Sequence, residues 1–491
     1  MPLRRLIPLL AGLLLAFLAL WQLEQARSGV STRSLDVGDT PATVYWREGT
    51  PPAPTVIVSH GFAGSRPLMQ AFSFHLARAG YRVLAYDALG HGRNPQPMSG
   101  DVTAIDGTTA LLVAETQRVI AAARQLDDAT GEVALLGHSM ASDIVIRAAL
   151  AEGDIDNVIA VSMFSEAVTD TAPARLLVIS GEWESRLRTV ALSALQQVDA
   201  AAGEDETATV GDVQRRATVS PGVEHVGVLF SEHSLQESLD WLNAGFQRSA
   251  GSPVTATGLW ILALLLGIVL TFRPLVARLP AGQPPPPASS RRLLLAIGLP
   301  MLIAPALGVL LYRPFLPVLV ADYLLLHFVL FAAIQLAVLG RWPLRRGDVS
   351  WPGLALLLVW GLLLVGTAID RYAASFMPNS QRLLIILALS LATVPFMLAD
   401  SLVSGAGTGR WWQRVLPRLA LLISLAIAAL LRPEELGFVL LVFPVILLFF
   451  LVHGTLGRAL AQRTGAAASG IGLGLILAWA LGVSFPFFAV G

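Results

Sequence analysis

A single stretch, Glu132-Val133-Ala134-Leu135-Leu136-Gly137-His138-Ser139-Met140-Ala141-Ser142, decides the fold of the first half of this chain. An apolar run of strand length ends in a turn at Ser139, and a helix-like segment follows up to Ala151. A strand, a sharp turn and a helix in this order can hold a nucleophilic serine above the edge of a sheet. So tight a turn needs small residues two before and two after the serine, and Gly137 and Ala141 meet this need. The alternative is a plain strand-to-helix turn in which Ser139 only caps the helix.

Two more turns extend the pattern. The apolar segment 54–59 runs into His60-Gly61-Phe62, and the segment 81–86 runs into Asp87-Ala88-Leu89-Gly90-His91-Gly92. The chain thus contains three strands that each end in a motif: His-Gly, then Asp-x-x-Gly-His-Gly, then Gly-His-Ser-x-small. The three motifs in this order resemble the α/β-hydrolase superfamily of serine hydrolases. The resemblance covers about residues 40–247 and implies the α/β-hydrolase fold, a mostly parallel sheet flanked by helices. It also implies a serine hydrolase of the esterase or lipase type that works without a cofactor or a metal.

Helix and strand patterns alternate through this region, as a mostly parallel sheet requires. Further strands are expected at 41–48, 158–164, 174–180 and 215–219, and helices at 66–79, 108–128, 139–151 and 231–247. Family members often insert a lid between the strands expected at 158–164 and 174–180. Only residues 165–173 lie there, so we expect no large lid and an open cleft that can face a membrane.

The resemblance implies that Ser139 works with an acid and a histidine that follow it in the chain in that order. A serine hydroxyl needs a base to take its proton, and the base needs an acid to orient it. The histidine is expected after the last strand, where His225 in Pro221-Gly222-Val223-Glu224-His225 fits the family's Pro-Gly-x-x-His turn. His233, inside the last expected helix, is the alternative base.

The acid is expected after the strand at 174–180. In the family it commonly stands three residues after a glycine at the end of this strand, which selects Glu184 after Gly181. Aspartate is more usual than glutamate at this place, so the choice departs from the family's pattern. Glu182 and Asp170 therefore stay open as alternatives.

Backbone N–H groups complete the expected site. The family's oxyanion hole takes one N–H from the residue after the nucleophile, here Met140, and one from the His-Gly turn, here Phe62. Each such donor typically contributes ~3 kcal/mol to the transition state. Asp87 is expected to fix the turn after its strand rather than to take part in the chemistry. The turns also contain three histidines that are expected to position their loops: His60, His91 and His138.

The composition of the whole chain is unlike that of a soluble hydrolase. The 491 residues are 54% hydrophobic and only 14% charged, which is too apolar for a wholly soluble protein. The net charge is zero, so we expect no nucleic-acid partner. Cysteine is absent, which excludes disulfides, thiol nucleophiles and cysteine metal sites. All 34 basic residues are arginine, which excludes lysine Schiff-base chemistry.

Apolar segments of membrane-spanning length account for this composition. The first runs from Leu6 to Trp21 after two arginines, and we favour a signal anchor over residues 1–24 rather than a cleaved signal peptide. An α/β-hydrolase domain is expected at 28–250 and an all-α polytopic membrane domain at 251–491. Eight further spans are expected near 254–272, 293–312, 315–339, 351–369, 383–403, 415–431, 436–453 and 469–490.

The arginines indicate the orientation, because positively charged loops stay on the inner side of a membrane. With the N-terminus inside, 14 arginines fall inside and 4 fall in short outside loops. We therefore expect a multi-pass protein of the plasma (inner) membrane, with the hydrolase domain on the extracytoplasmic side and the proline-rich linker 283–290 inside. The inside arginines are Arg4, Arg5, Arg273, Arg278, Arg291, Arg292, Arg341, Arg345, Arg346, Arg410, Arg414, Arg418, Arg458 and Arg463; the outside ones are Arg313, Arg371, Arg382 and Arg432.

A few ionisable residues lie within the expected spans. Asp322, Tyr323 and His327 fall in one span and Asp400 near the inner end of another. Such residues are costly in a membrane and often functional. Tyr323 and His327 share a helix face because they are four residues apart. Interhelical hydrogen bonds are one interpretation, and a pocket for a lipid or an ion is the other.

Three functions remain open at this stage. The first is a membrane-anchored serine hydrolase that cleaves a lipid or other small acyl ester through a Ser-His-Glu triad. The second is an acyltransferase that passes the same acyl-serine to an alcohol or a glycan. The third is a polytopic transport or scaffold protein with an inactive hydrolase-like domain, which the Ser139 and His225 motifs disfavour. In each case the lipid bilayer is the expected partner.

Reporter fusions test the orientation. A reporter fused after Gln247 should lie outside, and a reporter fused after Ala288 should lie inside, because the arginine asymmetry places the intervening span in this direction. A cytoplasmic signal from the fusion after Gln247 would overturn both the topology and the expected compartment.

Overall fold

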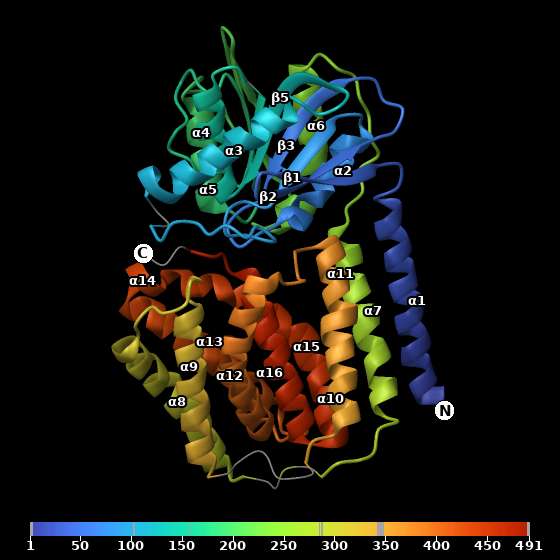
Figure 1. Cartoon of the computed structure of the whole chain (residues 1–491), viewed down its shortest axis with the longest axis vertical. Helices are drawn as coiled ribbons and strands as arrows, with labels where there is room; N and C mark the ends of the chain where they lie inside the picture. Colours follow the sequence, from blue (N-terminus) through green and yellow to red (C-terminus); the bar gives the residue numbers. More distant parts are fainter. Residues whose placement is uncertain are drawn as a thin grey trace.

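The computed structural model describes residues 3–101, 104–155, 157–283, 285, 288–340 and 348–488. Figure 1 shows two stacked parts, a sheet with flanking helices above and a bundle of long helices below. The upper part, the sheet part, contains the strands β1 to β9, and the lower part, the helical part, contains the helices α7 to α16. The N-terminal helix α1 (Leu3–Gln25) runs along the outside of the bundle beside α7 (Gly258–Val276).

One sheet organises the upper part. Among the described residues its strand order is β1-β2-β4-β3-β5-β6-β7-β9-β8. The pairs from β4 to β9 are parallel, while β1 and β2 on one edge and β8 on the other are antiparallel. This confirms the expected α/β-hydrolase fold class. The strands are β1 (Ser31–Val37), β2 (Thr40–Trp46), β3 (Ala53–Ser59), β4 (Arg82–Tyr86), β5 (Ala129–His138), β6 (Asn157–Val161), β7 (Arg175–Gly181), β8 (Thr207–Val210) and β9 (Val213–Ser220).

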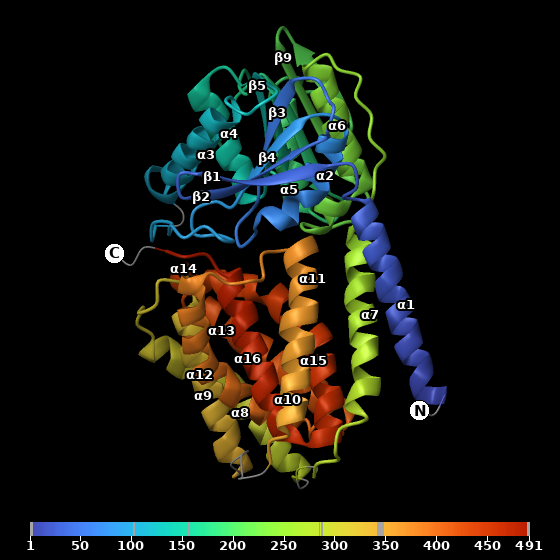
Figure 2. The same cartoon turned by 45° about the vertical axis from the view of Figure 1, so that its right-hand side comes forward.

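Helices cover both faces of this sheet (Figure 2). Alternate residues of β5 serve the two faces: Val133 and Leu135 join one apolar core, and Ala134 and Leu136 join the other. Because both faces are buried, the central strands read as continuous apolar runs. The helices α2 (Gln70–Arg78) and α6 (Glu232–Gly245) pack on one face, and α3 (Ala110–Ala123), α4 (Met140–Glu152) and α5 (Ser185–Gln196) pack on the other. Short helices precede α2, α3 and α6: η1 (Arg66–Met69), η2 (Ile105–Thr109) and η3 (Gly227–Phe230).

The structure adds three elements to those expected from the sequence. β1 and β8 are edge strands with mostly partly exposed or exposed residues, so neither carries a run of apolar residues. α5 follows the candidate acid directly and buries only three of its residues. The strand expected at 158–164 ends earlier, at Val161, because Ser162 adopts a positive φ of 53°. Residues 162–174 contain no helix or strand.

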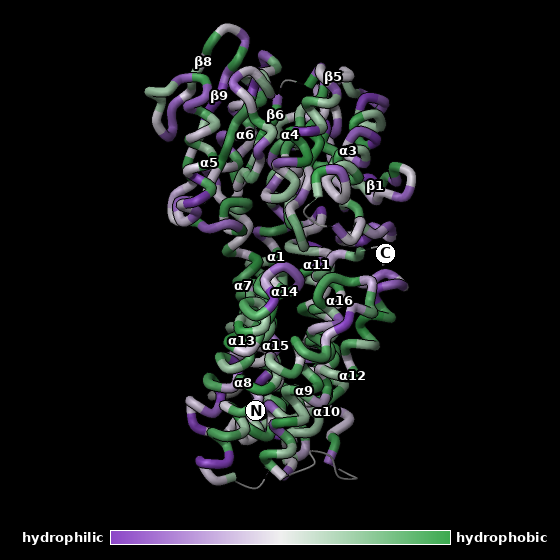
Figure 3. Tube along the Cα trace, turned by 90° about the vertical axis from the view of Figure 1, so that its left-hand side faces the viewer, coloured by the Kyte–Doolittle hydropathy of each residue, from purple (hydrophilic) through white to green (hydrophobic). Residues whose placement is uncertain are grey.

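The helical part is made of long apolar helices (Figure 3). Within the described residues, nine helical segments, α1 included, are long and apolar enough to cross a membrane, which suggests a membrane protein. α16 lies at the centre, since 83% of its most apolar window is buried. The other segments are α8 (Ser290–Leu311), α9 (Ala321–Leu339), α10–η4–α11 (Trp351–Leu358, Val359–Leu364, Val365–Tyr372), α12 (Ser380–Val403), α13 (Trp411–Leu431), α14–η5–α15 (Pro433–Leu436, Gly437–Val442, Phe443–Thr464) and α16 (Ala466–Ser484).

Close packing holds α1 against α7. A Cβ added to Gly12 would lie 2.9 Å from the Gly267 carbonyl oxygen, and one added to Gly267 would lie 2.7 Å from the Ala16 nitrogen. Small residues at such crossings let the two backbones approach closely.

Of the features used for the orientation, Arg341, Arg345 and Arg346 and the prolines at 284, 286 and 287 lie outside the described residues.

The polar residues within the spans are hydrogen-bonded between elements. Asp322 accepts from the Phe315 N–H at 2.9 Å and from the Tyr312 hydroxyl at 3.2 Å. His327 lies 3.1 Å from the Tyr323 hydroxyl through Nδ1 and 3.1 Å from the Ser424 hydroxyl through Nε2. These contacts support the interpretation as interhelical hydrogen bonds for this group.

The two parts of the molecule meet around the buried guanidinium of Arg382, near the start of α12. It donates to Gly92 O at 3.1 Å and Gly90 O at 3.1 Å in the sheet part, and to Gly482 O at 3.0 Å and Phe485 O at 2.7 Å in the helical part. The segment after α16 continues into the sheet part, where Phe487 pairs with the backbone of Gly90 and Met98 and Phe488 joins the apolar core.

Removing this guanidinium should loosen the junction. Arg382→Met leaves four buried carbonyl oxygens without their donor, which typically costs about 1–3 kcal/mol for each group left unpaired. We expect the melting temperature of the full-length protein in detergent to fall by roughly 5 °C or more. Arg432→Met is the matched control, because Arg432 forms a partly exposed ion pair with Glu435 that contributes little. Equal melting temperatures for the two variants would contradict the structural role of Arg382.

Candidate active site

Ser139 stands at the turn between β5 and α4. Its backbone has a φ of 53° and a ψ of −120°, a strained conformation for a residue with a side chain. Such a turn pushes the hydroxyl out of the sheet edge. The turn is as tight as the sequence predicted, since a Cβ on Gly137 would lie 2.4 Å from the Ala141 carbonyl oxygen.

The structure brings Ser139, His225 and Glu184 together. His225 Nε2 lies 2.9 Å from Ser139 Oγ, and His225 Nδ1 lies 2.6 Å from Glu184 Oε1. The three residues come from the turns that follow β5, β9 and β7, and these parallel strands end at the same edge of the sheet. A nucleophile, a base and an acid thus form one hydrogen-bonded chain.

The alternative residues lie in other contacts. His233 is on α6, where its Nε2 lies 2.8 Å from the Thr218 hydroxyl. Glu182 accepts from the Gly222 N–H at 2.6 Å. Asp170 precedes β7, whereas Glu184 follows it, and Asp170 interacts electrostatically with Arg215. Among the described contacts none joins these three residues to Ser139.

Glu184 is a buried carboxylate with three donors around it. Besides His225, the Ser162 hydroxyl donates to Oε2 at 2.8 Å and the Gly181 N–H donates to it at 2.6 Å. Burial alone would raise the pKa of this carboxyl, but the hydrogen bonds from His225, Gly181 and Ser162 together lower it below its ordinary value. Glu184 is therefore charged at neutral pH. The sequence carried no local signal for Ser162, whose role depends on its positive φ after β6.

The expected oxyanion donors lie beside the nucleophile. A Cβ on Gly61 would lie 2.9 Å from the Ser139 Cβ, so the turn with Phe62 packs directly on Ser139. The Phe62 N–H has no acceptor among the described residues. Met140 is the first residue of α4, and an N–H at this position has no partner inside its own helix. Both donors are thus available to a ligand.

Three buried histidines support the turns, as the sequence indicated. Burial lowers the pKa of His138 to about 3, so its ring is neutral and its Nε2–H donates to the His225 carbonyl at 2.9 Å. His60 accepts from the Ala88 N–H through Nε2 at 3.1 Å and donates to Gly61 O through Nδ1 at 2.8 Å. The His91 ring lies 5.5 Å from the Phe62 ring.

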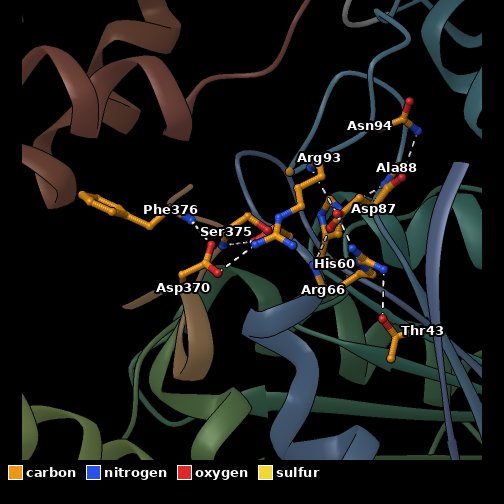
Figure 4. A network of polar contacts seen from close by, with 12 residues as sticks. Thr43, His60, Arg66, Asp87, Ala88, Arg93, Asn94, Asp370, Ser375 and Phe376 are labelled. Carbon is orange, nitrogen blue, oxygen red and sulfur yellow. Dashed lines mark hydrogen bonds and ion pairs between the residues drawn. The ribbon is translucent and has the colours of Figure 1, made fainter. Parts of the chain in front are cut away.

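A polar network links this region to the helical part (Figure 4). Asp87 accepts from the Arg93 backbone N–H at 3.1 Å, which fixes the turn after β4 as expected. It also accepts from the Arg66 backbone N–H at 2.8 Å and from Arg66 Nε at 3.1 Å, which ties this turn to η1. Arg93 forms an ion pair with Asp370 at 2.8 Å. Figure 4 shows that Asp370 and Ser375 approach this network from the helical part.

The helical part also contacts the turn with Phe62. The Phe62 and Phe438 rings lie 5.4 Å apart, and Ser65 Oγ accepts from the Ser375 N–H at 2.8 Å. No lid lies between β6 and β7. The helical part borders the site on the side of Phe62. The expected open cleft is therefore bounded on this side.

One protein-family model matches the sheet part of the chain. Residues 50–211 match the family model described as serine aminopeptidase, S33. No curated protein matches the chain in sequence. The first part of the chain is thus a hydrolase of the α/β-hydrolase superfamily.

Solved structures similar to the chain include a dienelactone hydrolase from Anabaena variabilis (18% identity, TM-score 0.33, covering 44% of this chain and 97% of that one). A predicted CIB-like hydrolase from Thermoplasma acidophilum has 16% identity and a TM-score of 0.35, over 44% of this chain and 98% of that one. The ferulic-acid-bound Est1E from Butyrivibrio proteoclasticus has 16% identity and a TM-score of 0.32, over 44% and 100%.

The acid can be tested by paired substitutions. Glu184→Gln should keep the fold and lower ester turnover by on the order of 10³–10⁴-fold, because a neutral amide cannot hold His225 in the right tautomer. Ser162→Ala removes one donor to Glu184 and should lower turnover by a smaller factor. Glu182→Gln, only two residues away, should leave turnover close to that of the wild type. A larger loss in Glu182→Gln than in Glu184→Gln would show that the acid is assigned to the wrong residue.

Proposed function

We propose that this protein is a membrane-anchored serine hydrolase that cleaves an acyl ester, with Ser139 as nucleophile, His225 as base and Glu184 as acid. The observation that carries the proposal is the continuous chain from Ser139 Oγ to His225 at 2.9 Å and from His225 to Glu184 at 2.6 Å. Because Nδ1–H donates to the carboxylate, the Nε2 lone pair points at the serine hydroxyl.

Each step of ester cleavage has a group to perform it. Ser139 Oγ attacks the ester carbonyl while His225 Nε2 takes its proton, and the N–H groups of Phe62 and Met140 stabilise the oxyanion. The intermediate then collapses, His225 gives its proton to the leaving alcohol, and an acyl-serine remains. Water, deprotonated by His225, attacks the acyl-serine. His225 then returns the proton to Ser139 Oγ as the carboxylic acid leaves, which restores the free enzyme. Glu184 stays ionised throughout and stabilises the imidazolium that forms at His225.

The surroundings favour an apolar acyl group. Three of the turns at this edge hold an exposed apolar side chain: Trp183 beside Glu184 (68% exposed), Val226 beside His225 (44%) and Phe164 after β6 (58%). Phe62, on the fourth turn, lies against Phe438 of the helical part. The position between exposed apolar residues and a bundle of apolar helices supports a lipid or another acyl ester as substrate. In the orientation expected from the arginines, the reaction takes place on the extracytoplasmic side.

The nucleophile is tested by covalent labelling of the full-length protein with a fluorophosphonate. Ser139→Ala should abolish labelling and ester hydrolysis, and His225→Ala should lose nearly as much, on the order of 10⁶-fold in turnover, because the groups act as a unit. His233→Ala should keep most of the activity, since that ring contacts Thr218.

Circular dichroism would verify that each variant keeps its fold. Labelling that persists in a folded Ser139→Ala variant would refute the nucleophile, and loss of activity in His233→Ala alone would refute the base. A screen of acyl esters of increasing chain length would then define the substrate class.

A further inference from the structure

A small cleft lies at the end of the bundle away from the sheet. The ends of α12, α13, α15 and α16 line it. α12 begins beside the sheet part at Arg382, and Asp400 lies eighteen residues further along the helix, which corresponds to about 27 Å. The polar side chains around the cleft are Asp400, Ser401, Ser404, Arg414, Arg418, Arg458 and Ser469.

The arginines of this cleft have few partners. The Arg414 guanidinium makes no hydrogen bond or ion pair with any described residue, and its Nε is buried without an acceptor. Arg418 Nε is also buried without an acceptor, although Arg418 Nη1 donates to the Arg414 carbonyl oxygen and its Nη2 forms an ion pair with Asp400 at 3.6 Å. The Arg418 guanidinium also lies over the ring of Phe450. Arg458 donates one hydrogen bond, from Nε to Gly407 O at 3.3 Å. Buried donors without acceptors are rare in folded proteins and require an explanation.

Positive charge exceeds negative charge at this end of the molecule. Arg458 lies within electrostatic range of Arg273, Arg414 and Arg418. In the sequence after residue 251, the segments at this end contain only two acidic residues, Asp348 and Asp400. Membrane orientation requires arginines on the inner side. It does not require three of them, from two helices, to converge on one cleft with unused donors.

We propose that this cleft binds the phosphate group of an anionic ligand. Guanidinium groups donate several hydrogen bonds in a fixed plane, which suits phosphate oxygens. Arg414, Arg418 and Arg458 supply the donors, and a phosphate would offset the excess positive charge. The cavity volume is about 20 Å³, enough for one or two water-sized groups. The phosphate oxygens therefore enter, and the rest of the ligand stays outside.

The position of the cleft points to phospholipid headgroups of the inner leaflet as one source of this phosphate, since basic pockets between spanning helices bind such headgroups. Free inorganic phosphate presents the same chemistry from the inner aqueous side. The proposal is independent of the ester hydrolysis proposed above, because Ser139 lies in the sheet part and the cleft lies at the end of the bundle away from the sheet part.

The experiment uses the full-length protein in nanodiscs of phosphatidylcholine. Inorganic phosphate is added in one arm, and in the other arm phosphatidylglycerol replaces part of the phosphatidylcholine. Melting temperature and lipid retention by native mass spectrometry are measured for the wild type, Arg414→Gln and Arg458→Gln. Arg291→Gln is the matched control, since Arg291 is exposed at the same end of the bundle, loses the same charge and does not line the cleft.

A saturable rise in melting temperature with either probe is expected in the wild type and in Arg291→Gln. The affinity for the probe that stabilises the wild type should be about tenfold or more lower in Arg414→Gln and Arg458→Gln than in the wild type. A response to phosphatidylglycerol alone assigns the site to a lipid headgroup, and a response to inorganic phosphate assigns it to a soluble ligand. No saturable response to either probe overturns the proposal. An equal loss in Arg291→Gln also overturns it, because the attraction would then belong to the whole charged surface.

Discussion

The buried guanidinium of Arg382 is the interaction on which the arrangement of the two parts depends. A charge removed from water is tolerated only when hydrogen bonds replace its hydration. Here the replacement comes from carbonyl oxygens of both parts, those of Gly90 and Gly92 on one side and of Gly482 and Phe485 on the other. Separating the parts would leave the charge and the carbonyls unpaired together, so the junction forms as a unit.

The same junction supports the candidate active site. Gly92 adopts a positive φ of 51°, and a Cβ there would lie 2.5 Å from the Asp87 carboxylate, so the loop that Arg382 holds is packed on Asp87. Asp87 fixes Arg66, and the Ala88 N–H donates to His60 beside the turn of Phe62. A continuous set of contacts therefore leads from α12 to the expected oxyanion donor. The helical part therefore supports the candidate site.

What could be predicted from the sequence follows from how local each feature is. The turn at Ser139 requires small residues within a few positions, and the order of strands in the chain places the residues after β5, β7 and β9 at one edge. Within these turns, the resemblance to the family selected His225 and Glu184, and the structure brings both to Ser139. β1 and β8 could not be predicted, because edge strands lack a continuous apolar pattern. Neither could the role of Arg382, because its partner Gly92 is 290 residues away and the local sequence indicates only a charge in a loop.

Two arginines, one near each end of α12, show how the pairing of guanidinium donors distinguishes a structural role from a ligand-binding role. At one end, Arg382 has four carbonyl acceptors within 3.1 Å and lies against the ring of Phe487, so its hydrogen-bonding capacity is almost filled by the protein. Near the other end, the Arg414 guanidinium has no partner among the described residues, although its Nε is buried. Both are arginines at the ends of apolar helices, and composition alone treats them alike. The pairing of their donors is what distinguishes them: a guanidinium whose donors are paired by the protein stabilises the fold, and one with unpaired donors can bind an anionic ligand.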